Sequence, residues 1–253
     1  MKNKGKVIHT MAHPEQLQFV KSVLVTTANQ FQQKKIIEIG SYDVNGTVRN
    51  LFPGAEYLGV DLVEGPGVDL VCEGGKVDYE SNTFDLSISC ECFEHNPLWA
   101  DTFSNMYRLT KEGGLVIITV ATTGREEHGT TRTSPIDSPG TQSLRWDYYK
   151  NLIEQDFYDQ FDMKKMFENY LFISNEFSCD LYFLGIKRCS GSTSNFDIVK
   201  LKEMCIQDQK DLRNLVYKTK QYEKYTPKFL RKIIRKIYRI VKINDRYPRL
   251  IHL

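Results

Sequence analysis

Short apolar runs alternate with amphipathic segments along residues 34–121, and this alternation constrains the fold more than any other feature of the chain. The runs are rich in β-branched residues and are bounded by turn signals, as strands are. Strands that alternate with helices predict βαβ units, and runs that are apolar on both faces predict a buried parallel sheet. In chain order the runs are KKIIEIG, AEYLGVDLV, GVDLVCE, FDLSISCE and EGGLVIITVAT.

The segments around these runs have the character of helices, with one further strand. HPEQLQFVKSVLVTTANQF has apolar residues at helical spacing and predicts a helix that covers the site. NGTVRNLF, NPLWADTFSNMYRLTK and YDQFDMKKMFENY predict later helices, and DLYFLGIKR predicts a strand. The expected fold is α/β, with helices on both faces of a mostly parallel sheet. Right-handed crossovers then put the ligand site at the carboxyl ends of the strands.

The size and composition of the chain suit one α/β domain with an appendage. Its 253 residues are 41% hydrophobic, which is enough for a packed core. We expect the domain to span residues 1–190 and a linker with a basic helical tail to span 191–253. No apolar run approaches the roughly 18 residues of a membrane-spanning helix, and the N-terminus lacks the apolar stretch of a signal peptide. A cytoplasmic location is therefore expected, with peripheral membrane contact through the tail left open.

The cysteine pattern favours a reducing compartment and gives no metal motif. The six cysteines are scattered, and the closest pair is Cys90 and Cys92. A C-x-C pair is neither a zinc knuckle nor a C-x-x-C redox pair. We therefore expect reduced thiols and do not expect a metal site.

Charge divides the chain into an acidic body and a basic tail. Residues 210–253 hold 14 Lys and Arg against 3 Asp and Glu, although the whole chain has a net charge of only +2. Within the tail, residues 227–243 (PKFLRKIIRKIYRIVKI) have helical spacing, with one apolar face and basic residues over most of the rest. Three partners remain open: the body or a second subunit, as in a homodimer; an anionic membrane surface; and, less favoured, nucleic-acid phosphates.

The turn after the first strand matches neither common phosphate-binding pattern. In IIEIGSYDVNG the strand reaches Glu38 and turns at Gly40, and Gly46 follows six residues later. This spacing is neither the dinucleotide pattern G-x-G-x-x-G nor the phosphate loop G-x-x-x-x-G-K-[ST]. The next two strands end in acids, Asp61 and Glu73, and Asp61 comes 21 residues after Gly40. An acid there accepts both ribose hydroxyls, and Glu73 can accept from an adenine amino group, so these strand ends predict an adenosine pocket.

The order of the motifs IIEIGSYDVNG, YLGVDLVEG, DLVCEGG, FDLSISCECFEH and LTKEGGLVIITV resembles the class I S-adenosylmethionine-dependent methyltransferases over residues 34–121. In particular it is similar to the small-molecule type, the methyltransferase domain 11 family. The resemblance implies a Rossmann-like seven-stranded sheet in which DLYFLGIKR is the antiparallel last strand. It also implies S-adenosyl-L-methionine as the cofactor. Here Ser41 to Asn45 replace the middle glycines of the usual E-x-G-x-G-x-G loop, so the loop groups that touch the ligand stay open.

The resemblance further implies a role for each strand end. The first turn would border the methionine end of the cofactor, with the Ser41 hydroxyl a candidate partner for the carboxylate. The second strand end would hold the ribose, the third would border the adenine and the fourth would face the sulfonium. The cofactor-binding residues expected in this way are Glu38, Gly40, Ser41, Gly46, Asp61, Leu62, Glu73, Gly74, Cys90 and Glu91.

A long polar segment, residues 122–150, follows the fifth strand and predicts a lid over the acceptor site, because long loops inside compact domains are usually functional. His128 in this segment is a candidate general base, with a solvated loop histidine as the alternative. His95, after the fourth strand, is a second candidate, with a packing role as the alternative. His13 on the covering helix is a third and weaker candidate.

Aromatic and basic residues of the same segment are candidate acceptor contacts. The aromatic side chains would form a wall for the acceptor or, equally, would anchor the lid to the core. The arginines would bind an anionic acceptor such as a carboxylate or phosphate, or would simply be solvated. The residues concerned are Trp146, Tyr148 and Tyr149 for the wall, and Arg125, Arg132 and Arg145 for the anion.

These features predict a methyltransferase that acts on a small molecule or a glycan precursor, by O- or N-methylation. The acidic body would repel a polyanion, and the fourth strand ends in SCECFEHNP instead of the N-P-P-[YF] motif of many nucleic-acid N-methyltransferases. Two alternatives stay open. One is an RNA methyltransferase that uses the basic tail, and the other is a membrane-associated binding protein without catalysis.

Overall fold

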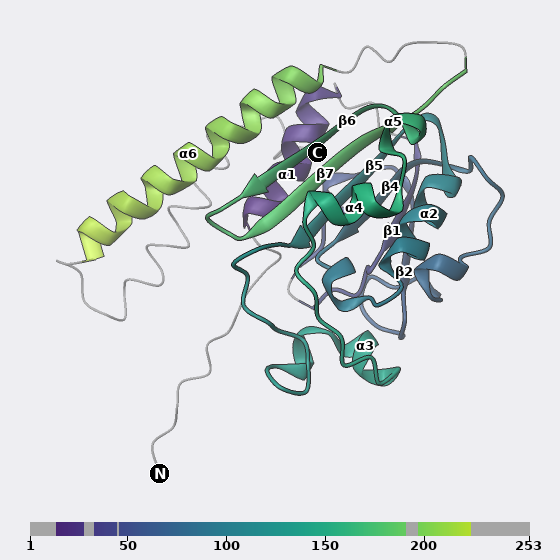
Figure 1. The fold of residues 1–253 in the computed structure, drawn as a ribbon, viewed down its shortest axis with the longest axis horizontal. Coiled ribbons are helices and arrows are strands. Elements are labelled where there is room, and N and C mark those ends of the chain that lie inside the picture. Colours follow the sequence, from purple (N-terminus) through teal and green to yellow (C-terminus); the bar gives the residue numbers. More distant parts are fainter. Residues whose placement is uncertain (1–13, 28–32, 45, 191–196, 224–253) are drawn as a thin grey trace.

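The computed structural model describes residues 14–27, 33–44, 46–190 and 197–223, which form a single sheet with helices packed on both faces (Figure 1). The strand order is β3-β2-β1-β4-β5-β7-β6. Successive strands on each side of β1 are joined by crossovers, as βαβ-type connections require. The strands are β1 (Lys35–Ile39), β2 (Glu56–Asp61), β3 (Leu70–Val71), β4 (Phe84–Cys90), β5 (Thr110–Ala121), β6 (Phe167–Asn175) and β7 (Asp180–Lys187).

Strands β1 to β5 pair in parallel, and β7 lies antiparallel between β5 and β6. This arrangement confirms the predicted Rossmann-like sheet of seven mostly parallel strands. Because β7 runs in reverse, its first residue, Asp180, lies beside Ala121 at the carboxyl end of β5. The carboxyl edge of the sheet therefore receives residues from both the end of β5 and the start of β7.

Alternate residues of each central strand pack on opposite faces of the sheet. Ile37 and Ile39 of β1 join one buried cluster with Phe103, whereas Ile36 joins another with Val20. Burial on both faces explains why these strands are near-continuous apolar runs. The helices that cover the sheet are α1 (Pro14–Thr26), α2 (Trp99–Leu109), α4 (Glu154–Gln160), α5 (Met163–Met166) and α6 (Ile198–Glu223), with the short α3 (Pro139–Ser143) in the lid.

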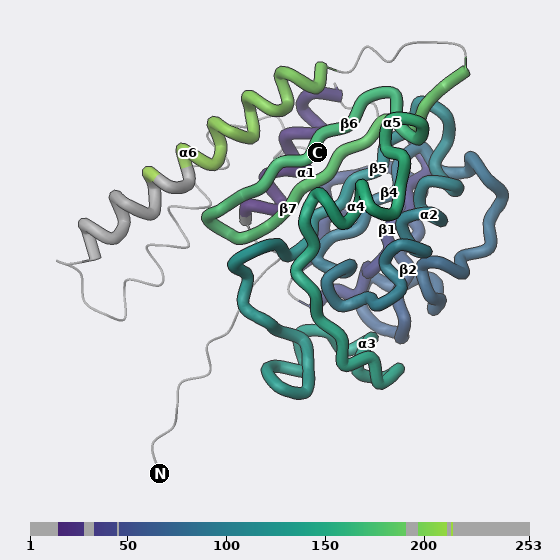
Figure 2. Tube along the Cα trace, in the orientation of Figure 1, coloured from purple at the N-terminus to yellow at the C-terminus, as the bar shows by residue number. Residues whose placement is uncertain are grey.

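Helix α6 packs beside α1 on one face, as the tube in Figure 2 makes clear. Leu201 is fully buried in the same cluster as α1. The buried Asp208 carboxylate accepts hydrogen bonds from Gln18 Nε2 at 3.1 Å and from Ser22 Oγ at 2.8 Å. In the region beyond residue 190, Ile198–Glu223 thus form a helix that docks on the body.

Two predicted helices are wrong. NGTVRNLF forms only a 3₁₀ turn at Arg49–Leu51, because the β-branched Thr47 and Val48 and the following Pro53 leave too few residues for an α-helix. YDQFDMKKMFENY was expected to be one helix, but it contains the end of α4, then α5, then the start of the edge strand β6. Asp162 caps α5 by accepting from the backbone N–H of Lys165, which separates the two helical pieces.

Residues 122–150 are mostly irregular, with one 3₁₀ turn and α3, and they extend away from the sheet near its carboxyl edge (Figure 1). None of the described helices is both long and apolar enough to cross a membrane. Two expectations lie outside the described residues, namely His13 and the basic helix over 227–243.

Candidate functional site

The candidate site lies at the carboxyl edge of the sheet where β1 and β4 are neighbours. The chain leaves β1 towards β2 on one side and continues through β4 on the other, so the strand order reverses there. In open α/β sheets, ligands bind in the crevice at such a switch point. Glu38 and Gly40 at the end of β1, and Cys90 and Glu91 at the end of β4, flank it.

Glu38 is a buried acid with one strong partner. Its side chain is 4% exposed, and its Oε2 accepts a hydrogen bond from the Tyr57 hydroxyl at 2.9 Å. Burial raises the pKa of Glu38 to about 7, although the Tyr57 hydrogen bond and the positive charge of Arg49 oppose that rise. A group of this kind changes charge near neutral pH, which is characteristic of functional sites.

Gly40 makes the tight turn out of β1. Its φ of +84° is in the left-handed region, and a Cβ there would lie 2.6 Å from Cys92 Cβ. Ser41 follows and is buried, and its Oγ has no hydrogen-bond partner within the described residues. The turn is held by the backbone N–H groups of Gly40 and Ser41, which both donate to the Val60 carbonyl.

The remainder of the first loop bonds to itself and to β2. Tyr42 donates its backbone N–H to Asp61 Oδ2 at 3.0 Å, and its ring packs against Gly65. Asp43 Oδ1 accepts from the backbone N–H of Gly46 at 2.6 Å, an Asx-type turn that gives Gly46 its place in the loop.

Asp61 has a double role at the end of β2. Its Oδ1 accepts from its neighbour Leu62 N–H at 2.7 Å, and its Oδ2 accepts from the Tyr42 N–H. Burial raises the pKa of Asp61. The lid reaches this carboxylate as well, because a Cβ on Gly140 of α3 would lie 2.7 Å from Asp61 Oδ1 and 3.2 Å from Leu62 Cβ. The described lid conformation therefore closes over the expected ribose position.

Glu73 and Gly74 lie at the end of β3, the expected adenine border. Glu73 Oε1 pairs with Lys76 Nζ at 2.7 Å near the surface. Gly74 is buried, and a Cβ there would come 2.6 Å from Ile39 and 2.7 Å from Thr102. Its carbonyl accepts from Asn105 Nδ2 of α2 at 2.8 Å, so the turn is fixed to the helix.

Cys90 is the last residue of β4, and Glu91 is the residue that follows it. Burial and the charge of Glu38 raise the pKa of the Cys90 thiol, so this side chain is a neutral group at physiological pH. Glu91 has a φ of +50°, a left-handed conformation that is uncommon for glutamate and that tends to occur at functional sites. Its carboxylate is buried, and neither oxygen has a hydrogen-bond partner within the described part of the chain.

Three acidic side chains surround Arg125 at the first residues of the lid. Arg125 Nη1 lies 3.1 Å from Asp180 Oδ1 and also donates to the Ser178 carbonyl, and Nη2 lies 3.7 Å from Glu91 Oε2. Glu94 also interacts with Arg125 through its charge. Burial raises the pKa values of all three acids, to about 7 for Glu94 and about 6 for Asp180. The guanidinium predicted to hold an anionic acceptor is thus engaged by carboxylates of the protein.

His95 and His128 come together, as two candidates for general base should. Their ring centroids are 4.8 Å apart, and each ring also contacts that of Tyr149, at 5.4 Å and 5.0 Å respectively. His95 is 4% exposed, and burial lowers its pKa to about 3, with the charges of His128 and Arg125 acting in the same direction. His95 is therefore a neutral imidazole at physiological pH.

The other lid candidates lie apart from this group. Arg132 pairs with Glu127 and Asp147 at the surface, and Arg145 is exposed with a φ of +57°. Trp146 and Tyr148 are half-buried, and the backbone N–H of Trp146 donates to the Thr141 carbonyl within the lid. Of the three predicted wall residues, Tyr149 is the one with a ring contact to the histidines.

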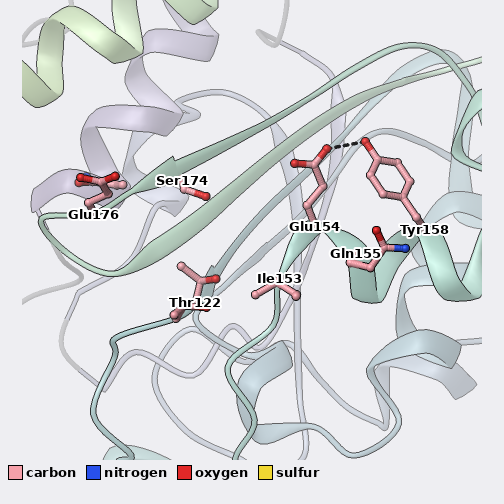
Figure 3. Close-up of a pocket in the computed structure, with 9 residues that line it drawn as sticks. Thr122, Ile153, Glu154, Gln155, Tyr158, Ser174 and Glu176 are labelled. Atoms are coloured by element: carbon pink, nitrogen blue, oxygen red, sulfur yellow. Dashed lines mark hydrogen bonds between the residues drawn. The ribbon is translucent and has the colours of Figure 1, made fainter.

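A surface pocket opens between α4 and the ends of β5 and β6, next to the base of the lid (Figure 3). Its wall includes Glu154 and Tyr158, whose side chains are hydrogen-bonded to each other across one face. Asn175, also in the wall, donates to the Tyr182 hydroxyl, and that hydroxyl donates to Asp180. The pocket is thereby connected to the acids around Arg125.

Two residues of this edge, Glu94 and Asp180, were not among the sequence candidates. A signal for Glu94 was available, because Glu91, Glu94 and His95 occur as E-x-x-E-H directly after a buried strand. Asp180 carries a weaker signal. As the first residue of an antiparallel strand it lies at the carboxyl edge, but only the strand pairing reveals this.

Comparison with known proteins supports one family. Residues 45–118 match the family model described as a methyltransferase domain. Together with the strand order, this match confirms the predicted resemblance to class I methyltransferases. No curated relative matches the chain.

Several solved structures are similar at low identity. One is phosphoethanolamine N-methyltransferase 2 of Haemonchus contortus in complex with S-adenosyl-L-methionine, with 15% identity, a TM-score of 0.49 and coverage of 68% of this chain and 52% of that one. Another is 1,6-didemethyltoxoflavin-N1-methyltransferase of Burkholderia thailandensis, with 14% identity, a TM-score of 0.47 and coverage of 69% and 80%. The chain spans about half the length of the nematode enzyme.

Proposed function

We propose that this chain is an S-adenosylmethionine-dependent methyltransferase whose acceptor is a small molecule or a glycan precursor, methylated at oxygen or nitrogen. The observation that carries the proposal is the methyltransferase domain match over residues 45–118, on a sheet whose β1 and β4 ends form the switch point. Neighbouring acids at that edge, Glu38 and Asp61, supply acceptors for the two polar parts of the cofactor.

The residues present fit this cofactor. Each Asp61 oxygen accepts one backbone N–H and can accept a second hydrogen bond, so the carboxylate can hold ribose hydroxyls once α3 of the lid, which packs against Oδ1, moves aside. Ser41 Oγ is a buried hydroxyl that lacks a partner within the described residues, beside the turn expected to meet the methionine end. Glu38 would hold the ammonium group there. When bound, S-adenosylmethionine supplies an electrophilic methyl group.

The acceptor side is assigned to the edge between β4 and the lid. The rings of His128 and Tyr149 contact each other, and the buried ring of His95 contacts both of them. His128 on the lid offers the proton acceptor for an acceptor hydroxyl or amine, whereas the lowered pKa of His95 makes that imidazole a weak base. Positioning carries much of the rate of a methyl transfer, so the lid that closes over Asp61 would hold the two reactants together and exclude water.

Calorimetric titration with S-adenosylhomocysteine tests the proposal. We expect one site per chain, with affinity reduced at least about tenfold in Asp61→Ala, since each good hydrogen bond to a charged group contributes about 1.5–3 kcal/mol. Glu64→Gln is the matched control, because Glu64 is an exposed acid three residues away. Absence of binding, or equal affinity in Asp61→Ala, would contradict the proposal.

The basic tail favours a second candidate, an RNA methyltransferase, because residues 210–253 hold 14 basic and 3 acidic residues. RNA binding that weakens steeply with salt and disappears on deletion of 224–253 would support it. A membrane-associated binding protein without catalysis is the third possibility. Co-sedimentation with anionic vesicles, in a protein that does not bind S-adenosylhomocysteine, would support that one.

A further inference from the structure

Three side chains that can bind a metal ion converge at the edge between β4 and the lid. Glu94 and His95 lie in the 3₁₀ turn Phe93–His95 that follows β4, and His128 comes from the lid. One ligand atom from each residue lies within 4.8 Å of the others. Two of the three residues are consecutive in sequence, so the turn fixes their relative position before the lid adds the third.

Two atoms of this cluster are buried without hydrogen-bond partners. His95 Nδ1 and Glu94 Oε2 have none within the described residues, and the two side chains are 4% and 0% exposed. Leaving a buried polar atom unpaired costs about 1–3 kcal/mol, so such atoms are rare in folded proteins. Two of them in adjacent residues of one cluster point to a ligand that both bind.

Charge at this edge favours a cation. The carboxyl groups of Glu91, Glu94 and Asp180 lie around the guanidinium of Arg125. Arg125 pairs with Asp180 and Glu91 within 4 Å but not with Glu94, so the Glu94 carboxyl group is the one placed to serve as a ligand for a cation.

The orientation of His128 suits a ligand role. Its Nδ1 lies 3.1 Å from the Glu126 carbonyl, which can only accept, so Nδ1 carries the proton and donates. Nε2 is then the unprotonated nitrogen, the one whose chemistry allows it to accept a hydrogen bond or bind a metal. A histidine that binds a metal through one nitrogen commonly donates from the other to a carbonyl or carboxylate, which fixes the ring.

We propose that Glu94, His95 and His128 bind a divalent transition-metal ion, with zinc preferred. Two imidazoles and one carboxylate form a ligand set for zinc and its neighbours, whereas magnesium and calcium prefer oxygen ligands alone. Bonds of about 2.0–2.2 Å require the ligand atoms to lie closer together than 4.8 Å, and rotation of the half-buried His128 on the lid can supply that movement. Three protein ligands leave a position for water or for an acceptor.

The location of the ion has a consequence for the acceptor, which rests on the proposed function. The cluster adjoins Glu91, at the strand end where the resemblance puts the sulfonium. An ion at this edge would bind an acceptor through an oxygen atom and lower the pKa of a hydroxyl there. The acceptor class favoured by this site is therefore a hydroxyl compound that can bind a metal, rather than an amine.

Cobalt(II) titration of the full chain tests the site. The protein is first stripped with a chelator, and Co²⁺ is added while visible absorption is recorded, because that spectrum reports protein ligands. We expect one Co²⁺ per chain, displaced by one Zn²⁺. His128→Gln and Glu94→Gln should weaken binding about 100-fold or more, whereas Glu126→Gln, an exposed neighbour in the same loop, should bind like the wild type.

The proposal would be overturned if the protein bound no Co²⁺ through protein ligands. It would also be overturned if His128→Gln and Glu94→Gln both bound Co²⁺ with wild-type affinity, because the ion would then be bound elsewhere, for example by a cysteine. His128 is on the lid and only half-buried, so its replacement should leave the fold intact. Titration of the same proteins with S-adenosylhomocysteine separates the two claims. Cofactor binding without metal binding would defeat the metal site alone.

Discussion

Replacing Glu38 by glutamine should change the pH dependence of stability in a way that identifies this buried acid. The pKa of Glu38 is raised from 4.5 to about 7, mainly by burial. Between these values the folded protein holds a proton that the unfolded chain has released, so stability falls as pH rises through this window. At about 1.4 kcal/mol per pKa unit, ionised Glu38 costs the folded state about 3 kcal/mol above pH 7.

Glutamine keeps the shape and can still accept the Tyr57 hydrogen bond, but it never ionises. Relative to wild type, Glu38→Gln should therefore have similar stability at pH 5 and be more stable at pH 8, by up to about 3 kcal/mol. Urea unfolding from pH 5 to pH 8.5, without ligand, measures this difference. Other buried acids titrate in both proteins and cancel in the comparison.

Glu56→Gln is the control, because Glu56 is an exposed acid on β2 with only a surface ion pair to Lys35. Its difference from wild type should stay small at every pH. If the Glu38→Gln difference were also constant from pH 5 to pH 8, the reasoning from burial to a raised pKa would be refuted.

Three further changes follow from the packing. Gly40→Ala should lower the free energy of unfolding by about 2–4 kcal/mol, because Gly40 has a positive φ and a Cβ there would clash with Cys92. Gly113→Ala, also at positive φ but in open space, should lower it by only about 1 kcal/mol. The denaturant midpoints of the two variants test this difference. Leu201→Ala should destabilise the protein by about 2–5 kcal/mol, whereas Val199→Ala, at an exposed position of the same helix, should change stability very little. Equal losses of stability in the two variants would mean that α6 is not docked. Gly140→Ala should push α3 away from Asp61 and speed amide exchange in residues 140–143. Unchanged exchange would contradict the lid contact.

Much of the fold could be predicted from the sequence, because buried parallel strands are near-continuous apolar runs. KKIIEIG and EGGLVIITVAT become β1 and β5, and DLYFLGIKR becomes the antiparallel β7. The edge strand β6 was missed since FENYLFISN shows no clean alternation and an edge strand packs on fewer neighbours. Its pairing with β7 decides its structure, and local sequence does not record that pairing.

The site residues likewise include some that could be located from the sequence and some that could not. Glu38, Gly40 and Glu91 could be located, because strand ends on a parallel sheet share one edge. The arrangement around Arg125 could not, since its partner Asp180 is 55 residues away and reaches the edge only through the reversed direction of β7. The contact of α3 with Asp61 likewise depends on how the lid folds back, which the composition of residues 122–150 does not specify.

Parallel calorimetric titrations of the full chain with S-adenosylhomocysteine and with NAD test the central claim most directly. Both ligands offer an adenosine to the carboxyl edge, but only NAD needs a loop that holds a pyrophosphate, and the loop around Gly40 lacks that pattern. The account predicts that S-adenosylhomocysteine binds at one site per chain and that NAD does not bind. Binding of NAD with no response to S-adenosylhomocysteine would contradict it.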